Sequence, residues 1–190
     1  MNLLPTPSQT IGPFFHFCLT PGEALGRLAG PDAMGERLRL LVRVRDADGA
    51  PVGDAMIELW QADAGGKYHH PDDTQELPAD PGFRGFGRLA TNADGACVFE
   101  TVKPGQARGP RGTLQAPHVN LSLFARGLVD RLVTRVYFAG ERANHQDPVL
   151  ALAPEDRRHT LLAHPDAGNP GVWTFEIHLG GERETVFFDV

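Results

Sequence analysis

Strand-type sequence broken by turn signals runs through this chain from residue 36 to residue 190. The clearest stretch is residues 37–45, where leucines and valines at alternate positions are separated by arginines, with Leu41 the one departure. A period of two is typical of a strand with one buried face. The same reasoning predicts strands at residues 55–61, 85–91, 96–102, 119–125, 132–138, 172–179 and 184–190. So many short strands predict an all-β fold, either a sandwich or a barrel.

Turn residues mark the boundaries between these strands. Residues 46–49 and 92–95 each end in Asp-Gly, and glycine can adopt the positive φ that tight turns require. We therefore expect hairpins around residues 92–95 and around Gly180 and Gly181. The chain's 22 glycines and 16 prolines fit many short strands joined by turns. The one short helical segment expected is residues 154–162, which begins with a proline.

The length of 190 residues fits one domain rather than two. We divide it into an extended N-terminal arm and linker, residues 1–35, and a β-sheet domain, residues 36–190. The arm is rich in proline between residues 3 and 17, which disfavours regular helix and central strand there. Its aromatic cluster, residues 14–17, needs burial either on its own domain or on a partner.

Composition excludes several classes of function. The net charge is −6 with both signs mixed along the chain, which argues against a nucleic-acid partner. No apolar run approaches the roughly 20 residues that span a bilayer, so we expect no membrane contact. The start of the chain lacks the features of a signal peptide. Cys18 and Cys97 lie far apart and are interpreted as thiols of a cytoplasmic protein.

Tyr68 and His118 are the candidate metal ligands. Phenolate and imidazole together suit Fe(III), because hard anionic oxygen stabilises the ferric state. Two ligands are too few for a stable mononuclear site, and Asn120, on the same strand face as His118, is a poor ligand. His69 and His70 are adjacent, so on a strand they would point to opposite faces. From the residues alone, Tyr68 is a loop tyrosine and His118 a core histidine with a hydrogen-bond partner.

Three segments resemble the signature of the intradiol ring-cleavage dioxygenases. They are residues 57–68 (IELWQADAGGKY), 101–105 (TVKPG) and 117–124 (PHVNLSLF). The resemblance implies a single-domain β-sandwich. In catalytic members of that family, two tyrosines and two histidines bind a non-haem Fe(III).

The family pattern implies that this chain has lost its own metal site. The four ligands of the pattern fall on Tyr68, Ala107, His118 and Asn120, so two of the four keep the required type. The arginine that assists the activated substrate falls on Gln115. We interpret the four as vestigial metal-site positions and expect no metal ligand and no catalytic residue in this chain.

Other segments resemble the non-catalytic α-type subunits of the family. They are residues 7–14, 120–127, 134–138 and 184–190, and the matches run in order along nearly the whole chain. The resemblance implies a β-subunit partner that binds the Fe(III), and αβ protomers that assemble into a larger oligomer. It also implies cleavage of protocatechuate by O2 to 3-carboxy-cis,cis-muconate, a step of aromatic catabolism by the β-ketoadipate pathway.

The same resemblance implies that this chain contributes to the partner's substrate pocket at the subunit interface, through Thr10, Gly12, Pro13 and Arg126. A guanidinium complements the carboxylate of protocatechuate, and a glycine permits close backbone approach. The alternative is that Arg126 is an ordinary surface arginine and the other three are plain arm residues.

Two other functions stay open. One is a β-sandwich binding or scaffold module without a catalytic partner, using the aromatic cluster as a docking patch. The other is a self-sufficient dioxygenase with altered ligands. Co-purification of a second chain of similar size tests the first alternative, and iron content of this chain alone tests the second.

Overall fold

The computed structural model describes residues 18–109 and 112–189. Its strands are β1 (Arg37–Arg45), β2 (Met56–Gln61), β3 (Phe86–Ala90), β4 (Ala96–Val102), β5 (Ala107–Arg108), β6 (Leu114–Gln115), β7 (His118–Phe124), β8 (Leu132–Phe138), β9 (Leu162–Pro165) and β10 (Val172–His178). Its 3-10 helices are η1 (Glu23–Gly26), η3 (Arg142–Gln146), η4 (Leu150–Leu152) and η5 (Glu155–Leu161). Each strand predicted before residue 180 is present to within one residue at either end, whereas β5, β6 and β9 were not predicted.

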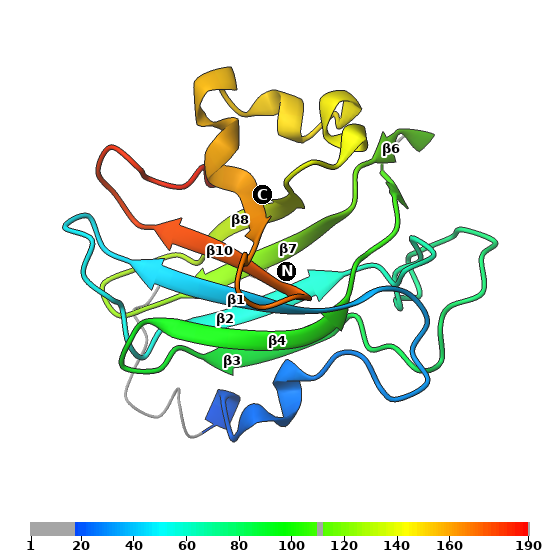
Figure 1. Cartoon of the computed structure of the whole chain (residues 1–190), viewed down its shortest axis with the longest axis horizontal. Coiled ribbons are helices and arrows are strands. Elements are labelled where there is room, and N and C mark those ends of the chain that lie inside the picture. Colours follow the sequence, from blue (N-terminus) through cyan, green and yellow to red (C-terminus); the bar gives the residue numbers. More distant parts are fainter. Residues whose placement is uncertain (1–17, 110–111, 190) are drawn as a thin grey trace, which may run out of the picture.

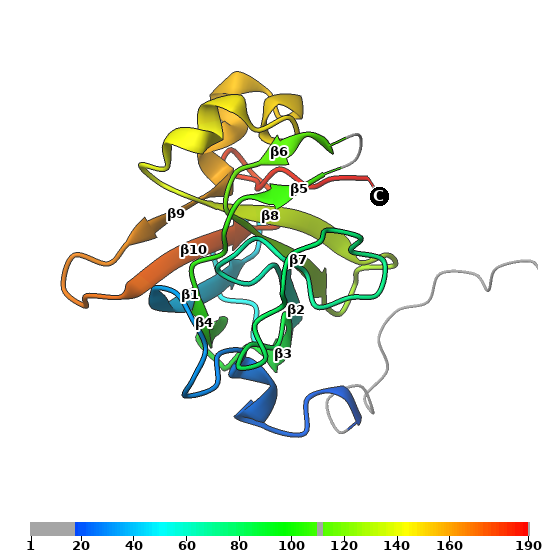
Figure 2. The same ribbon diagram turned by 90° about the vertical axis from the view of Figure 1, so that its right-hand side faces the viewer.

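Eight of these strands form one hydrogen-bonded sheet that folds over on itself. Their order is β3-β2-β7-β8-β9-β10-β1-β4. Strand β9 joins the two halves, because it pairs in parallel with β8 and antiparallel with β10. In Figure 1 the layer of β10, β1 and β4 lies in front of the layer of β8, β7 and β2, and Figure 2 shows the same arrangement turned by 90°. The predicted β-sandwich is confirmed.

The main core fills the space between the two layers. On β1 the side chains of Leu38, Leu40, Val42 and Val44 are all buried, as their alternation predicts. They pack with inward-facing residues of the other layer, including Ile57, Leu59, Val119, Leu121, Leu123 and Val136. This apolar packing supplies most of the driving force for the fold and holds β2 and β7 rigidly in register.

The predicted hairpin around residues 92–95 is wrong. The turn itself forms, with Gly95 at φ 71° and its N–H bonded to the Asn92 carbonyl at 2.9 Å. However, β3 pairs with β2 and β4 pairs with β1, so the turn carries the chain from one layer to the other. Alternation identifies which face of a strand is buried, but it does not say which neighbour occupies each edge.

The predicted C-terminal hairpin around Gly180 and Gly181 is also wrong. Residues 172–178 form β10, but residues 184–189 are not a strand. The tail keeps two hydrogen bonds to His178 of β10, from Thr185 N–H to the His178 carbonyl and from His178 N–H to Thr185 Oγ1. The N–H of Phe188 then donates to the Val133 carbonyl of β8. Strand β1 pairs with β10 along its whole length, whereas β9 pairs with the other edge only at Trp173 and Thr174, so the tail contacts β10 beside the turn and then passes to β8 instead of running back along β10.

The predicted helical segment is the 3-10 helix η5, with Pro154 just before it. Helices η3, η4 and η5 lie together beside the end of β8 (Figure 1). A small second core joins them to the sheet; its buried members are Ala116, Tyr137, Leu150, Ala153 and Leu161. This second core packs beside the end of β7 that carries His118.

Of the predicted arm and linker, residues 1–17 lie outside the described residues. In the part that the structure describes, Leu28 is buried in the main core, and its N–H donates to the Glu100 carbonyl at 2.8 Å. No helix in the described residues is long and apolar enough to cross a membrane.

Candidate functional site

Three of the four vestigial metal-site positions meet at one end of β7. His118 begins that strand and Asn120 follows on the same face, while Tyr68 comes from the loop after β2. The Tyr68 hydroxyl lies 3.1 Å from His118 Nε2 and 3.3 Å from Asn120 Nδ2. The sequence prediction that these residues form one site is therefore consistent with the geometry.

The hydrogen bonds of this cluster determine the tautomer of the histidine. His118 Nδ1 lies 2.7 Å from the Ala116 carbonyl, so Nδ1 carries the proton and Nε2 is an acceptor. The Tyr68 hydroxyl therefore donates to Nε2 and accepts from the Asn120 amide, which also donates to the Trp60 carbonyl at 3.2 Å. The Tyr68 hydroxyl and His118 Nε2 are therefore hydrogen-bonded to each other, and neither atom is left free to bind a metal ion.

Burial keeps both rings neutral. It raises the pKa of Tyr68, against the opposing effects of the Asn120 hydrogen bond and the Arg135 charge. It also lowers the pKa of His118 to about 4, and the positive charge of Arg135 acts in the same direction. At neutral pH the pair is therefore a phenol donating to a neutral imidazole.

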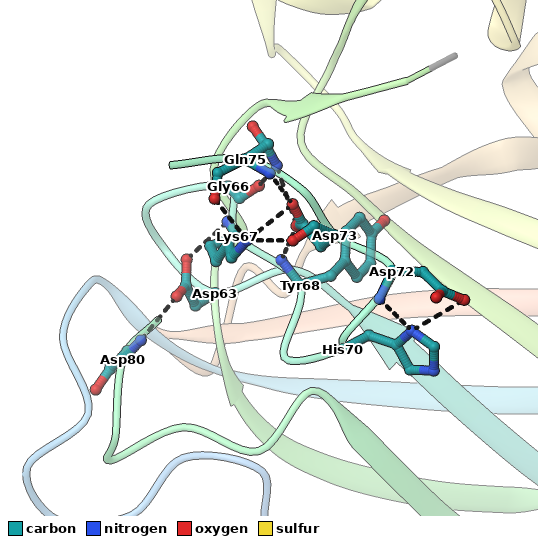
Figure 3. A network of polar contacts seen from close by, with 9 residues as sticks. All are labelled: Asp63, Gly66, Lys67, Tyr68, His70, Asp72, Asp73, Gln75 and Asp80. Atoms are coloured by element: carbon teal, nitrogen blue, oxygen red, sulfur yellow. Dashed lines mark hydrogen bonds and ion pairs between the residues drawn. The ribbon is translucent and has the colours of Figure 1, made fainter. Parts of the chain in front are cut away.

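The loop that carries Tyr68 is held by a partly buried ion pair between Lys67 and Asp73 (Figure 3). Lys67 Nζ donates to the Asp73 carboxylate at 3.0 Å and to the carbonyls of Asp73 and Gln75 at 2.6 and 2.8 Å. The Tyr68 N–H donates to the other Asp73 oxygen at 2.7 Å. Burial alone would raise the pKa of Asp73, but hydrogen bonds from Gln75, Tyr68 and Lys67 lower it to about 2.

A second carboxylate closes the start of this loop. Asp63 accepts from the N–H groups of Gly65 and Lys67 through Oδ1. It also accepts from Asp80 N–H through Oδ2, and Figure 3 shows its bonds with Lys67 and Asp80. Gly66 has φ 84°, and a Cβ there would lie 2.1 Å from the Gln106 carbonyl oxygen. The loop is therefore pressed against the segment that leads into β5, where Ala107 stands.

Ala107, the fourth vestigial position, is buried on β5 and pairs with Gln115 of β6. Gln115 in turn accepts a hydrogen bond from Arg135 Nη1 at 2.6 Å. Arg135 belongs to β8 and lies directly opposite Asn120 in the β7–β8 ladder. An arginine is thus close to the site, although it comes from another strand than the family pattern implies.

These donors do not fit Fe(III). The four positions supply one phenol, one imidazole, one amide and a methyl group. The family pattern requires two phenols and two imidazoles. In the part of the chain that the structure describes, no group of three or more His, Cys, Asp or Glu residues is arranged to hold a metal ion.

An open cleft of about 990 Å³ lies beside Tyr68, between its loop and the β5–β6 hairpin. Trp60 stacks on Tyr68 with ring centroids 5.7 Å apart, and these two rings line one wall. Arg108 and Gly109 line the other. Trp60 and Tyr68, both within the segment that resembles the family signature, therefore line a cleft although the set of metal ligands is incomplete.

Arg126 lies at the opposite end of β7 from His118, beyond Phe124. Its side chain is 79% exposed and forms an ion pair with Asp54, Nε to Oδ2, at 2.8 Å. The structure does not bring it into the cleft beside Tyr68. Thr10, Gly12 and Pro13 lie outside the described residues, so the pocket contribution predicted for these four residues stays a prediction.

Sequence reasoning missed Asp63, Asp73 and Arg135. The Asp-Ala-Gly-Gly run at residues 63–66 is a turn signal that could have pointed to Asp63. No local signal marks the other two, because their partners are set by loop packing and by strand register.

Comparison with known proteins gives consistent results. A family model described as dioxygenase (Dioxygenase_C) matches residues 12–181. The protocatechuate 3,4-dioxygenase alpha chain of Burkholderia cepacia is 43% identical, over all of this chain and 99% of that one. The beta chain of the same enzyme from that organism is 36% identical, over 81% of this chain and 68% of that one. The dioxygenase domain of a carbohydrate-binding fusion protein from Streptomyces sp. SirexAA-E superposes with a TM-score of 0.63 at 29% identity, covering 93% of this chain and 99% of that one.

Proposed function

Because this chain belongs to the intradiol dioxygenase family, we propose that it is the α-type, iron-free subunit of a protocatechuate 3,4-dioxygenase. Its partner is a β-type chain of related sequence, and the two form αβ protomers that assemble further. The full-length similarity to an alpha chain, with a separate beta chain also matched, supports this proposal.

The observation that carries the proposal is the state of the ligand positions. Tyr68 and His118 are hydrogen-bonded to each other, and Ala107 and Asn120 offer neither a phenolate nor an imidazole. The non-haem Fe(III) of the enzyme therefore belongs to the partner, where it would supply ring cleavage. The role proposed for this chain is to form part of the wall of the partner's substrate pocket and to place a positive charge beside it.

Arg126 is the residue proposed to contact substrate. Its side chain is exposed, and its one ion pair, with Asp54, leaves guanidinium donors free in the described structure. A guanidinium near the partner's pocket would bind and orient the carboxylate of protocatechuate. Thr10, Gly12 and Pro13 are proposed to form part of the same pocket wall.

Co-expression with a β-type chain tests the proposal. The complex is expected to consume O2 with protocatechuate and to contain one iron per αβ pair, while this chain alone contains none. Deleting residues 1–17 is expected to weaken pairing and leave the sandwich folded. If this chain purifies alone from cells that also make a β-type chain, the binding or scaffold module is the better description.

A further inference from the structure

We propose that a small pocket between helix η5, the outer face of strands β9 and β10 and the loop after β10 binds an organic acid that carries two or more carboxylates. The pocket has a volume of about 310 Å³. The inference goes beyond the proposed function, because this pocket includes neither Arg126 nor any of the vestigial metal-site positions. It therefore concerns a separate site on this chain.

Strand alternation places polar side chains on the wall of this pocket. On β10, Thr174, Glu176 and His178 alternate with residues of the main core, so their side chains project from the outer face of the sheet. On β9, His164 also lies on the outer face, directly across the ladder from Thr174. Figure 2 shows the two strands side by side. All four of these side chains line the pocket.

Three of the chain's eight histidines line this one pocket. They are His159 from η5, His164 from β9 and His178 from β10. Among the residues that the structure describes, no three His, Cys, Asp or Glu side chains are arranged to hold a metal ion. The three imidazoles therefore do not converge on a single ion, and a ligand that contacts them all must extend over several atoms.

Most of the polar groups around the pocket are not used inside the protein. Within residues 18–109 and 112–189, no hydrogen bond or ion pair involves the Thr174 hydroxyl, the His164 ring or the Arg183 guanidinium. The His159 ring donates from Nδ1 to the Asp156 carbonyl at 2.8 Å, which leaves its Nε2 without a partner. Guanidinium, hydroxyl and protonated imidazole groups are hydrogen-bond donors that suit carboxylate oxygens. The pocket therefore presents several free groups that could hold an acid.

The charges around the pocket favour an anion although the chain as a whole is acidic. Among the described residues, Glu176 is the one carboxylate that lines the pocket. Its Oε2 lies 3.4 Å from His178 Nε2, and Arg43 of β1 stands directly across the ladder from it, where opposite charges attract. The negative charge of Glu176 therefore lies beside a histidine and opposite an arginine, whereas Arg183 has no carboxylate partner in the pocket wall.

The size of the pocket and the spread of its polar groups select the class of anion. Its volume lies at the lower end of the range of about 300–1,000 Å³ that is usual for small organic ligands. The oxygens of inorganic phosphate surround one atom, whereas an organic acid with separated carboxylates can reach His159 on one wall and His164 on another. Leu162 offers an apolar surface for the carbon chain between them.

The experiment uses the full chain without a partner, so its result does not depend on the proposed function. The probe is propane-1,2,3-tricarboxylate, and benzoate and inorganic phosphate are the comparison ligands. Binding is followed by NMR at constant pH and ionic strength, through the shifts of the histidine ring signals. Single His159→Gln, His164→Gln and His178→Gln variants assign the signals of the three pocket histidines.

We expect saturable shifts of the three pocket histidines, with a Kd for the tricarboxylate on the order of ten-fold lower than for benzoate or phosphate. Arg183→Gln should raise this Kd about ten-fold. Glu176→Gln should lower it, because the one negative charge of the pocket wall is removed. Arg131→Gln is the matched control: this exposed arginine lies outside the pocket, and its loss changes the net charge equally, so the Kd should stay the same.

Three outcomes would overturn the proposal. The first is that the pocket histidines show no saturable shift with the tricarboxylate. The second is that benzoate or phosphate binds as tightly, which would remove the proposed ligand class. The third is equal weakening by Arg183→Gln and Arg131→Gln, or weaker binding by Glu176→Gln, because the pocket would then not be acting through its own charges. Circular dichroism checks folding, and His164→Gln, at another exposed position, takes the place of Arg183→Gln if that variant does not fold.

Discussion

The two ends of β7 differ in how their polar groups are used. At one end His118 is buried, its two ring nitrogens are both hydrogen-bonded, and Tyr68 is its partner. At the other end Arg126 is exposed and holds a single ion pair with Asp54. A polar group with every bond satisfied inside the protein has little capacity left for a ligand. The exposed end keeps that capacity, and for this reason Arg126 is the residue proposed to contact substrate.

The largest expected effect comes from removing the ion pair that holds the Tyr68 loop beside His118. Lys67→Met leaves the Asp73 carboxylate buried without its cation, so we expect the free energy of unfolding to fall by about 3–5 kcal/mol. Urea unfolding followed by circular dichroism measures it. The matched control is Arg27→Met, which removes an ion pair with Glu100 whose side chains are 74% and 52% exposed. That change should cost less than about 1 kcal/mol. Equal losses would show that the loop is not held by its ion pair.

The pH dependence of stability reports on His118. Its pKa is lowered to about 4 in the folded chain from 6.5. As pH falls from 6.5 to 4 the unfolded chain takes up a proton that the folded chain refuses, so stability is present above 6.5 and is lost through this window. The loss should be about 3 kcal/mol. His118→Gln should remove this part of the pH dependence.

Urea unfolding at a series of pH values measures that difference between wild type and variant. The comparison isolates His118, because the other titrating groups are common to both proteins. An unchanged slope between pH 6.5 and 4 in the variant would mean that His118 is not held neutral by its surroundings.

At the exposed end, Arg126→Ala should raise KM for protocatechuate by the equivalent of about 1–3 kcal/mol, with a smaller effect on kcat. The reason is that a charge contact with a carboxylate remote from the ring-cleavage chemistry acts on substrate and transition state alike. Oxygen uptake by the αβ complex measures it. Catechol lacks the carboxylate, so its turnover should hardly change, and Arg126→Lys should recover part of the affinity.

An equal loss for both substrates, or an unchanged KM for protocatechuate, would remove Arg126 from the pocket. Iron content of the complex is the internal check, because the proposed iron site is in the partner and should be untouched.

The smallest effect is that of Arg126→Ala on the stability of the isolated chain. The ion pair with Asp54 is exposed, so its loss should lower the free energy of unfolding by less than about 1 kcal/mol. A loss as large as that of Lys67→Met would mean that the two ends of β7 do not differ as described.

Local sequence predicted the strands well, because each strand records its own burial pattern. The alternation of Leu38 to Val44 is the alternation found on β1, and the Asp-Gly turn at Gly95 is present. The absence of metal ligands at Ala107 and Asn120 could also be predicted from the sequence, since it depends only on the residue type at each position. Both hairpin predictions were wrong, because the identity of a strand's neighbours depends on the whole sheet.

The sequence by itself therefore determined the seven longer strands, which faces they bury and which ligand positions lack the required residue type, but not the short strands β5, β6 and β9 or the course of the C-terminal tail. Only the tertiary structure decided that β9 joins the two layers and that Asp73 holds the Tyr68 loop. It also placed Arg135 opposite Asn120 and against Gln115. Each of these contacts joins residues brought together by sheet register or loop packing. A periodic pattern along one strand carries information about that strand's own faces, whereas the partner across a ladder is chosen by the energy of the assembled core.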